Sequence, residues 1–450
     1  MFPGSKFHGL SQQAPSRPRH NRIGSQFRSA SVLLFDSPGK YSIGFIRIAQ
    51  LTGLFHTHPA TLAGDGSTWP GHRGENGDGR VAKLPHKLSS VELLWPFPLP
   101  SSGVGGVSAT DNFVSVSGHD SLDKDDVFVC LDPIAGAELW RLQHPAPQSL
   151  DYGNSARATP LIHDPWIYLV GAGGHLHCVD ADSGEVKWKR HLVDDLKGER
   201  PQWGYGGSPL LFDKHLIVQP GGRDHGIVAI DASNGEVAWK ATTDQTGYAS
   251  PQLVEVNNIV QIVGFDRKSL REWEASTGES SWTVTPGGSA EFHVPMPLID
   301  KNGTTTIGEV RGARRYGWNA DGKLSATPKA EQFELSPDMH SPVATAKQVF
   351  GVHKALMAIA IDDEMQIKWR IDDEAFLEHC SLMITEDRLL VVTERGELLL
   401  IDIMESTSGD RILYRKQLSN DGRSLAHPAL VGDILYIRSN GFLTAWAMVP

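Results

Sequence analysis

Residues 176–188 read Leu-His-Cys-Val-Asp-Ala-Asp-Ser-Gly-Glu-Val-Lys-Trp, and this stretch decides the fold. A short apolar strand ends at Val179, a turn runs from Asp180 to Gly184, and a second strand returns to Trp188. An Asp side chain can accept hydrogen bonds from the backbone N–H groups just ahead of it, and Gly tolerates a positive φ at the end of the turn. The stretch therefore predicts a hairpin that ends on a large aromatic ring, which needs a place to be buried.

The same hairpin recurs along the chain. In four copies the turn residue and the aromatic are eight positions apart: Asp132, Gly136 and Trp140; Asp180, Gly184 and Trp188; Asp231, Gly235 and Trp239; and Glu274, Gly278 and Trp282. Weaker copies start at Asn319, Asp362 and Asp402. The seven turn anchors are 40 to 51 residues apart. A strand-rich repeat of that length is typical of a propeller with four-stranded blades.

An eighth copy is divided between the two ends of the chain. The segment from Phe442 to Trp446 has the pattern of the strand before the turn, and the segment from Glu92 to Trp95 has that of the returning strand. Together they complete one blade and remove the open edge of a linear array. We predict an all-β, eight-bladed β-propeller of four-stranded antiparallel blades over residues 66–450, closed by pairing of the N- and C-terminal strands.

Residues 1–65 contain no repeat, and we expect either a disordered tail or an export signal there. The early part is rich in Ser, Arg and Pro, as disordered segments are. Residues 40–63 have a charged start, a modest apolar run from Ile48 to Phe55 and a small-residue end at Ala63, which is the outline of a secretory signal. This outline favours a periplasmic or secreted protein, and without a signal the protein would be cytoplasmic. No stretch is long and apolar enough to span a membrane.

Charge and cysteine content narrow the function classes. The chain carries a net charge of −11, although residues 1–60 contain seven Lys or Arg and one Asp. An acidic body argues against nucleic-acid binding, which needs clustered positive charge. Cys130, Cys178 and Cys380 show no CxxC spacing, so neither a disulfide framework nor a zinc site is expected.

The repeat resembles the Trp-docking repeat of the PQQ-type (quinoprotein alcohol dehydrogenase-like) propeller superfamily, over about residues 66–450. The stretch from Trp69 to Gly79, Trp-Pro-Gly-His-Arg-Gly-Glu-Asn-Gly-Asp-Gly, resembles the leader before the first blade in BamB-like bacterial envelope proteins. The resemblance implies that the repeated Trp packs between adjacent blades. The structural Trp residues would then be Trp95, Trp140, Trp188, Trp239, Trp282 and Trp369.

The superfamily contains enzymes and scaffolds on one fold, so the fold alone does not give the function. Its enzymes hold PQQ beside a disulfide between adjacent Cys residues, with calcium bound by Glu, Asn and Asp. This chain has no Cys-Cys pair and no CxxCH haem motif. The favoured interpretation is an exported, monomeric scaffold that binds another protein of the cell envelope, with no cofactor, metal or catalysis of its own. The alternative is a PQQ- and Ca²⁺-dependent alcohol dehydrogenase-like oxidoreductase.

A ligand or partner site is expected at the mouth of the central channel, where the innermost strands converge. The candidates are the residues that lead into the innermost strands, most of which open on a small residue followed by Pro, and they are Arg157, Trp203, Tyr205, Tyr248, His293, His340 and His379. In Trp203-Gly-Tyr205 the two rings are expected on one strand face. The alternative is that the rings only plug a narrow channel.

Other polar residues give no metal site in the sequence. His175 and His177 lie on one face of a predicted strand, but two histidines do not make a metal site without a third ligand. The carboxylates of Glu291, Asp338 and Glu378 come from three repeats, and no spacing shows that they converge.

Overall fold

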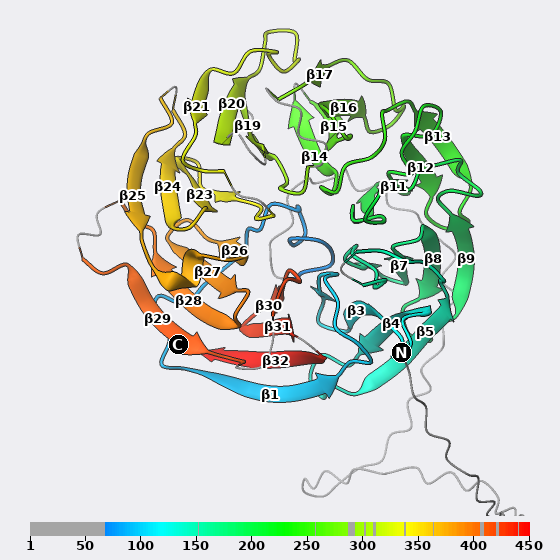
Figure 1. Cartoon of the computed structure of the whole chain (residues 1–450), viewed down its shortest axis with the longest axis horizontal. Helices are drawn as coiled ribbons and strands as arrows, with labels where there is room; N and C mark the ends of the chain where they lie inside the picture. Colours follow the sequence, from blue (N-terminus) through cyan, green and yellow to red (C-terminus); the bar gives the residue numbers. More distant parts are fainter. Residues whose placement is uncertain are drawn as a thin grey trace, which may run out of the picture. The chain divides into compact units, whose positions relative to one another are not determined.

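In the part of the chain that the computed structural model describes, the strands form eight sheets of four antiparallel strands, arranged in a ring (Figure 1). The described residues are 68–151, 153–256, 258–286, 293–300, 303–308, 312–336, 339–362, 364–405, 409–419, 423–439 and 441–450. The predicted tail or signal at residues 1–65 lies outside them, as do Glu291 and Asp338.

Each sheet is one blade, and its four strands are ordered from the innermost to the outermost. Blade 1 contains β2 (Ser108–Ala109), β3 (Val114–His119), β4 (Asp125–Leu131) and β5 (Glu138–Pro145). Blade 2 contains β6 (Leu161–His163), β7 (Trp166–Val170), β8 (His175–Asp180) and β9 (Val186–His191). Blade 3 contains β10 (Leu210–Phe212), β11 (His215–Val218), β12 (Ile227–Asp231) and β13 (Val237–Ala241). Blade 4 contains β14 (Gln252–Val256), β15 (Ile259–Phe265), β16 (Leu270–Glu274) and β17 (Thr283–Val284).

The remaining blades follow in chain order. Blade 5 contains β18 (Leu298–Asp300), β19 (Gly303–Gly308), β20 (Gly312–Gly317) and β21 (Ala330–Gln332). Blade 6 contains β22 (Val343–Ala344), β23 (Gln348–Val352), β24 (Leu356–Ala360) and β25 (Ile367–Ile371). The 3-10 helix η1 (Glu374–Phe376) leads to blade 7, with β26 (Cys380–Ile384), β27 (Arg388–Thr393), β28 (Glu397–Asp402) and β29 (Ile412–Gln417). Blade 8 contains β30 (Ala429–Val431), β31 (Ile434–Ser439), β32 (Phe442–Val449) and β1 (Ser90–Pro98).

The ring closes in blade 8. Blades 1 to 7 are each made of four consecutive strands, whereas blade 8 takes β1 from the start of the described chain and three strands from its end. The two terminal strands pair antiparallel, with Glu92 opposite Ala447 and Trp95 opposite Ala445. Both strands extend beyond the segments 92–95 and 442–446 that the repeat marks. This pairing completes blade 8, which lies between blades 7 and 1 and closes the ring (Figure 1).

The blades are less regular than the repeat suggests. The strands β2, β17 and β22 have only two residues each. In blade 5 the turn after Asn319 is not followed directly by the outer strand, because β21 starts at Ala330. The strength of a sequence copy therefore does not set the length of the outer strand, since the strong copy in blade 4 ends on the two-residue strand β17, whereas the weak copy in blade 7 has the six-residue strand β29.

A β-bulge precedes the aromatic residue in the outer strand of six blades. In blade 2, Cys178 lies opposite Trp188 and Val179 opposite Val186, so Lys187 is an extra residue. The same shift occurs in blades 1, 3, 6, 7 and 8. A bulge re-aims the side chains that follow it. The bulge therefore helps to point the aromatic side chain toward the neighbouring blade.

The antiparallel strand order gives the ring two different faces. The Asp-to-Gly turns join the third and fourth strands of each blade on one face. The loops that join the outermost strand of one blade to the innermost strand of the next lie on the opposite face. We call this opposite face the mouth face, and it includes residues 146–160 and 192–209.

Candidate functional site

The axis of the ring is occupied by the chain itself, through residues 69–81, which we call the leader. Trp69 is fully buried, exchanges two backbone hydrogen bonds with Ala109 at 2.7 and 2.8 Å, and stacks on the ring of His427 with centroids 5.7 Å apart. The carbonyl oxygen of Pro70 accepts a 2.8 Å hydrogen bond from the N–H of Ile162. The leader thus touches blades 1 and 2 and the loop that opens blade 8.

The rest of the leader reaches the opposite side of the ring. Gln252 of blade 4 donates a 3.2 Å hydrogen bond to the carbonyl oxygen of Gly77. The buried guanidinium of Arg73 donates a 2.5 Å hydrogen bond to the carbonyl oxygen of Pro342, just before blade 6. Gly79 accepts a 2.9 Å bond from the N–H of Ile384 in blade 7. A segment that contacts innermost strands on opposite sides lies in the channel, where Figure 1 shows it in blue.

Three of the seven mouth candidates form a cluster on the mouth face. The rings of Trp203 and Tyr248 have centroids 5.4 Å apart, and the backbone N–H of Trp203 donates to the Tyr248 hydroxyl at 3.3 Å. The indole Nε1 of Trp203 lies 3.3 Å from a carboxylate oxygen of Asp151. Arg157 donates to the carbonyl oxygens of Asp151, Ser155 and Gly153 at 2.7 to 3.0 Å. These contacts place Arg157, Trp203 and Tyr248 around one loop.

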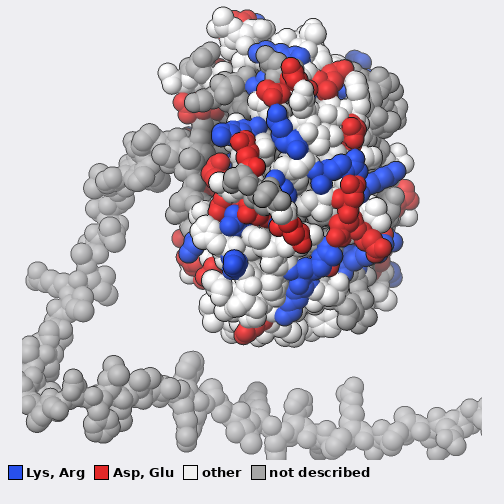
Figure 2. Space-filling model, turned by 90° about the vertical axis from the view of Figure 1, so that its left-hand side faces the viewer, with Lys and Arg blue, Asp and Glu red and all other residues white. Residues whose placement is uncertain are grey.

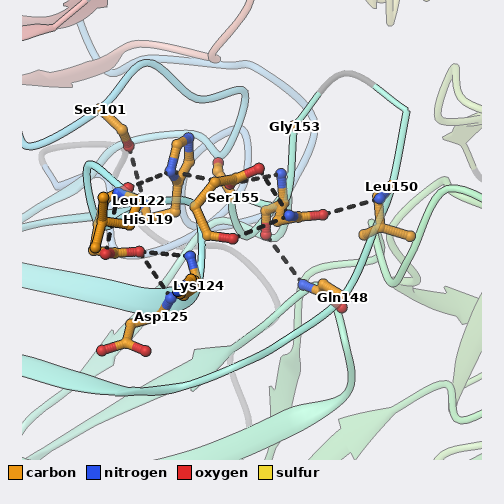
Figure 3. A network of polar contacts seen from close by, with 12 residues as sticks. Ser101, His119, Leu122, Lys124, Asp125, Gln148, Leu150, Gly153 and Ser155 are labelled. Carbon is orange, nitrogen blue, oxygen red and sulfur yellow. Dashed lines mark hydrogen bonds and ion pairs between the residues drawn. The ribbon is translucent and has the colours of Figure 1, made fainter. Parts of the chain in front are cut away.

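A polar network fixes this loop to blade 1 (Figure 3). The Asn154 side chain donates a 2.7 Å hydrogen bond to the Asp123 carboxylate and accepts one from the N–H of Leu150 at 2.9 Å. Gln148 donates to the carbonyl oxygen of Asn154 at 3.1 Å. The imidazole Nδ1 of His119 lies 3.1 Å from the same Asp123 carboxylate. These contacts therefore tie the described residues around Arg157 to blade 1.

The remaining tyrosine candidate, Tyr205, does not lie in this cluster. Tyr205 is buried in the core between blades 2 and 3, and its hydroxyl donates a 2.9 Å hydrogen bond to the carbonyl oxygen of Pro220. The expectation that Trp203 and Tyr205 share one strand face is wrong, because Gly204 has a φ of +79° and β10 begins only at Leu210. Burial also raises the pKa of Tyr205.

The three candidate histidines belong to the interior of the mouth. His293 is buried and stacks on Phe265 with ring centroids 4.2 Å apart. His340 and His379 meet edge to face at 5.1 Å. Burial lowers the pKa of His293 to about 4 and that of His379 to about 3, so both rings are neutral at pH 7. Glu378 pairs instead with Arg395 at 2.7 Å.

The mouth residues do not fit PQQ with calcium. A quinone that carries carboxylates needs fixed cations to hold it. His293 and His379 are neutral, and the Arg157 guanidinium already donates to three carbonyl oxygens. Calcium needs six to eight oxygen ligands, and no such set of carboxylates is gathered among the described mouth residues. The three cysteines are buried in three different blades, so they offer no adjacent pair.

One cluster on the mouth face was missed by sequence reasoning. Asp126, His144 and His175 place their ligand atoms within 4.8 Å of one another, and His177 lies beside them. The sequence shows His175 and His177 as a pair but does not show that blade 1 supplies the other members. The alternation of β4 and β5 and the docking of blade 1 on blade 2 would have been needed to find them.

The outer wall carries mixed charge. Figure 2 shows Lys and Arg interspersed with Asp and Glu on the side of the ring that includes blades 6 and 7. Several of these charges are paired, as in Arg370 with Asp372 at 2.5 Å and Arg415 with Asp373 at 2.8 Å. Such a surface offers no basic stripe for phosphates on this side. Among the described residues, no helix has the length and apolar character needed to cross a membrane.

Comparisons with known proteins agree with this architecture. The chain is 27% identical over 161 residues to the outer membrane protein assembly factor BamB of Burkholderia pseudomallei, a match that covers 36% of this chain and 37% of that protein. It is 25% identical over 176 residues to a 1-butanol dehydrogenase (cytochrome c) of Thauera butanivorans, covering 36% of this chain and 24% of that protein. The matches therefore span only 24% and 37% of the length of these relatives.

A solved structure and a family profile cover more of the chain. The crystal structure of BamB from Moraxella catarrhalis superposes with a TM-score of 0.57 at 14% identity, covering 80% of this chain and 98% of that one, which shows a common fold. The profile of the family described as outer membrane protein assembly factor BamB matches residues 123–370, just over half of the chain. This protein is therefore a PQQ-like β-propeller that belongs to the BamB family.

Proposed function

We propose that this protein is an exported scaffold that binds another protein of the cell envelope and has no catalysis of its own. The observation that carries the proposal is the outer strand of blade 8. Leu93 and Leu94 of β1 are 48% and 47% exposed, although both are large apolar residues. Exposed apolar side chains that lie together on a folded surface are typical of protein-interaction sites.

The apolar surface continues onto blade 1. The Trp95 indole donates a 3.1 Å hydrogen bond to the carbonyl oxygen of Pro133, which brings the turn of blade 1 next to β1. Ile134 in that turn is 73% exposed, and Leu139 on β5 is 45% exposed. We call Leu93, Leu94, Ile134 and Leu139 the seam patch.

The edge of β1 also differs from that of four of the seven other outer strands. Natural sheets protect exposed edges with Lys, and β9, β13, β25 and β29 each contain Lys. The strand β1, Ser-Val-Glu-Leu-Leu-Trp-Pro-Phe-Pro, contains neither Lys nor Arg. A partner protein that covers the seam patch would remove both the apolar side chains and the unprotected part of this edge from water.

The test is a comparison of matched surface variants. Leu94→Lys and Ile134→Lys each place a charge in the seam patch, and Ile259→Lys places the same charge at a half-exposed position in blade 4. Tagged protein, cross-linked in envelope extracts, should retain a defined partner with the parent chain and with Ile259→Lys. Retention should fall at least tenfold with both seam variants. Equal retention of every captured protein by all four chains would contradict the proposal.

Export is a separate part of the proposal, and it is supported by the pattern of residues 40–63. Cell fractionation and N-terminal sequencing of the mature protein test it. We expect an envelope fraction and a new N-terminus close after Ala63. A protein recovered intact from the cytoplasm would contradict export without affecting the seam patch.

A further inference from the structure

Three imidazole rings and one carboxylate meet where blade 1 joins blade 2 on the mouth face. Asp126 lies near the start of β4, and His144 is its partner on β5 in the antiparallel register. His175 opens β8, and His177 points to the same face because side chains alternate along a strand. The ring centroid of His144 lies 4.7 Å from that of His175 and 4.6 Å from that of His177.

The separations of the possible ligand atoms are close to those around a bound metal ion. Nε2 of His144 lies 3.9 Å from Oδ2 of Asp126, which is too far for a hydrogen bond. Two ligand atoms held by one tetrahedral zinc ion at about 2.0–2.1 Å are about 3.3–3.4 Å apart, so this pair would close by about half an ångström on binding. One ring nitrogen of His175 also lies within 4.8 Å of the ligand atoms of Asp126 and His144. A small rotation of that side chain would bring it to a bound separation.

The polar atoms of this cluster are buried without hydrogen bonds. Asp126 is 1% exposed, and neither of its carboxylate oxygens has a hydrogen-bond partner within the described residues. Within the described residues, Nε2 of His144 and Nδ1 of His175 and His177 are also buried and have no hydrogen-bond partner. Buried polar groups are normally paired, and an isolated buried carboxylate is strongly unfavourable. A cation among these atoms would give each of them a partner.

The absence of a side chain at Gly171 leaves space beside the Asp126 carboxylate. A Cβ atom placed on Gly171 would overlap Oδ2 of Asp126, so a side chain at this position would fill the site. Gly171 belongs to the loop that leads directly into His175. The loop therefore brings backbone, rather than a side chain, against the carboxylate.

The electrostatic environment suits neutral imidazole ligands. Burial lowers the pKa of His177 to about 3 and that of His175 to about 4, so both offer lone pairs at pH 7. Burial raises the pKa of Asp126 to about 7, and a bound cation would hold this carboxylate ionised.

Charged residues of both signs surround the cluster. Asp123 and Asp125 contribute negative charge near Asp126, whereas Arg157 and Lys189 contribute positive charge. The positive charge of Arg157 is partly compensated by the three carbonyl oxygens that it binds. A divalent ion would therefore not meet an excess of positive charge.

We propose that Asp126, His144 and His175 bind a divalent first-row transition-metal ion, with Zn²⁺ as the first choice. Imidazole nitrogen with one carboxylate suits zinc, copper or nickel, whereas Ca²⁺ and Mg²⁺ prefer oxygen ligands. Three protein ligands leave a fourth position, which water or a rotated His177 can fill. The site is independent of the seam patch, so either assignment can fail without the other.

Calorimetric titration of the chelator-treated full chain with ZnCl₂ tests this site. We expect one equivalent of zinc to bind, and Asp126→Asn and His175→Gln each to weaken the affinity at least tenfold. His86→Gln is the matched control, because His86 is an exposed histidine beside Asp387 of blade 7, and it should leave the affinity unchanged. Cobalt substitution should give visible ligand-field absorption that both site variants lose.

Two readouts keep the test decisive. Circular dichroism of each variant establishes that it is folded, and His175→Gln alters a partly exposed side chain if Asp126→Asn fails to fold. Absence of stoichiometric zinc binding by the parent chain would overturn the proposal. So would parent-like affinity in the folded site variants, or equally tight binding of Ca²⁺.

Discussion

The indole Nε1 of Trp140 donates a 2.7 Å hydrogen bond to the carbonyl oxygen of Ala181, the residue that follows the turn aspartate of the next blade. Trp188 makes the same bond to Ala232 at 2.9 Å. The outer hairpins of blades 1, 2 and 3 therefore each supply both a ring that docks on the next blade and a turn that receives the ring of the preceding blade. This explains why Asp, Gly and Trp recur together.

Trp188→Ala should be strongly destabilising. The ring is buried in the core between blades 2 and 3, and its loss leaves a cavity and removes one of the two hydrogen bonds that the Ala232 carbonyl oxygen accepts from Trp188 and Tyr168. Changes of this kind cost about 3–5 kcal/mol. Denaturant unfolding measures this cost, with Trp203→Ala at the mouth as the matched control, which should cost clearly less. Equal losses in the two variants would contradict the different roles of these rings.

Gly184→Ala should cost more than the same change at Gly432. Both residues have positive φ, 71° and 56°, so both variants pay the backbone penalty of about 1–2 kcal/mol. A Cβ at Gly184 would lie 2.7 Å from the ring of Trp140, whereas one at Gly432 meets nothing within 4 Å. The difference between the two unfolding free energies isolates the contact with the ring. Equal values would show that the ring can move away without cost.

The sequence was informative about the outer hairpins, because the turn chemistry and the docking ring are local features repeated in one order. It correctly indicated the pairing of the chain ends, with Glu92 opposite Ala447. It did not predict the β-bulge at Lys187, since a bulge changes the register without changing the residue pattern. It also did not predict that the leader occupies the channel, because contacts such as Arg73 with Pro342 join residues far apart in the chain.

Arg73→Ala should loosen the leader. The buried guanidinium binds the carbonyl oxygens of Pro342 and Asp78, and hydrogen bonds to charged groups contribute about 1.5–3 kcal/mol. We expect a loss of stability in this range and faster proteolysis within residues 69–81. Arg223→Ala is the control, because Arg223 is exposed and should cost less than about 0.5 kcal/mol. A leader that stays protected in Arg73→Ala would contradict its role as an anchor.

Stability should fall on acidification below pH 6.5, in part through His293. Burial lowers the pKa of His293 from 6.5 to about 4, so the unfolded chain binds the proton more readily than the folded chain. The stability contribution is complete above pH 6.5 and is lost as the pH falls toward 4, by up to about 3 kcal/mol. His293→Phe keeps a ring against Phe265 and removes the titration. Its unfolding free energy should depend less steeply on pH in this window, and parallel curves would contradict the assignment.

The mouth could be predicted only in part. Arg157, Trp203 and Tyr248 come together as the loop positions suggested, but Tyr205 turns into the core because Gly204 reverses the chain. Asp126 and His144 were missed because they lie within strands whose register with β8 no sequence spacing reveals. Residues at the join of two blades are the hardest to predict, since their neighbours come from another repeat.

The most direct test of the account is reconstitution of the purified protein with PQQ and Ca²⁺, followed by calorimetry and dye-linked alcohol oxidation. A non-catalytic scaffold predicts no stoichiometric PQQ binding and no oxidation above the background of the dye. Tight PQQ binding that depends on Ca²⁺ and is lost in Arg157→Ala and Trp203→Ala would contradict the account and favour the oxidoreductase.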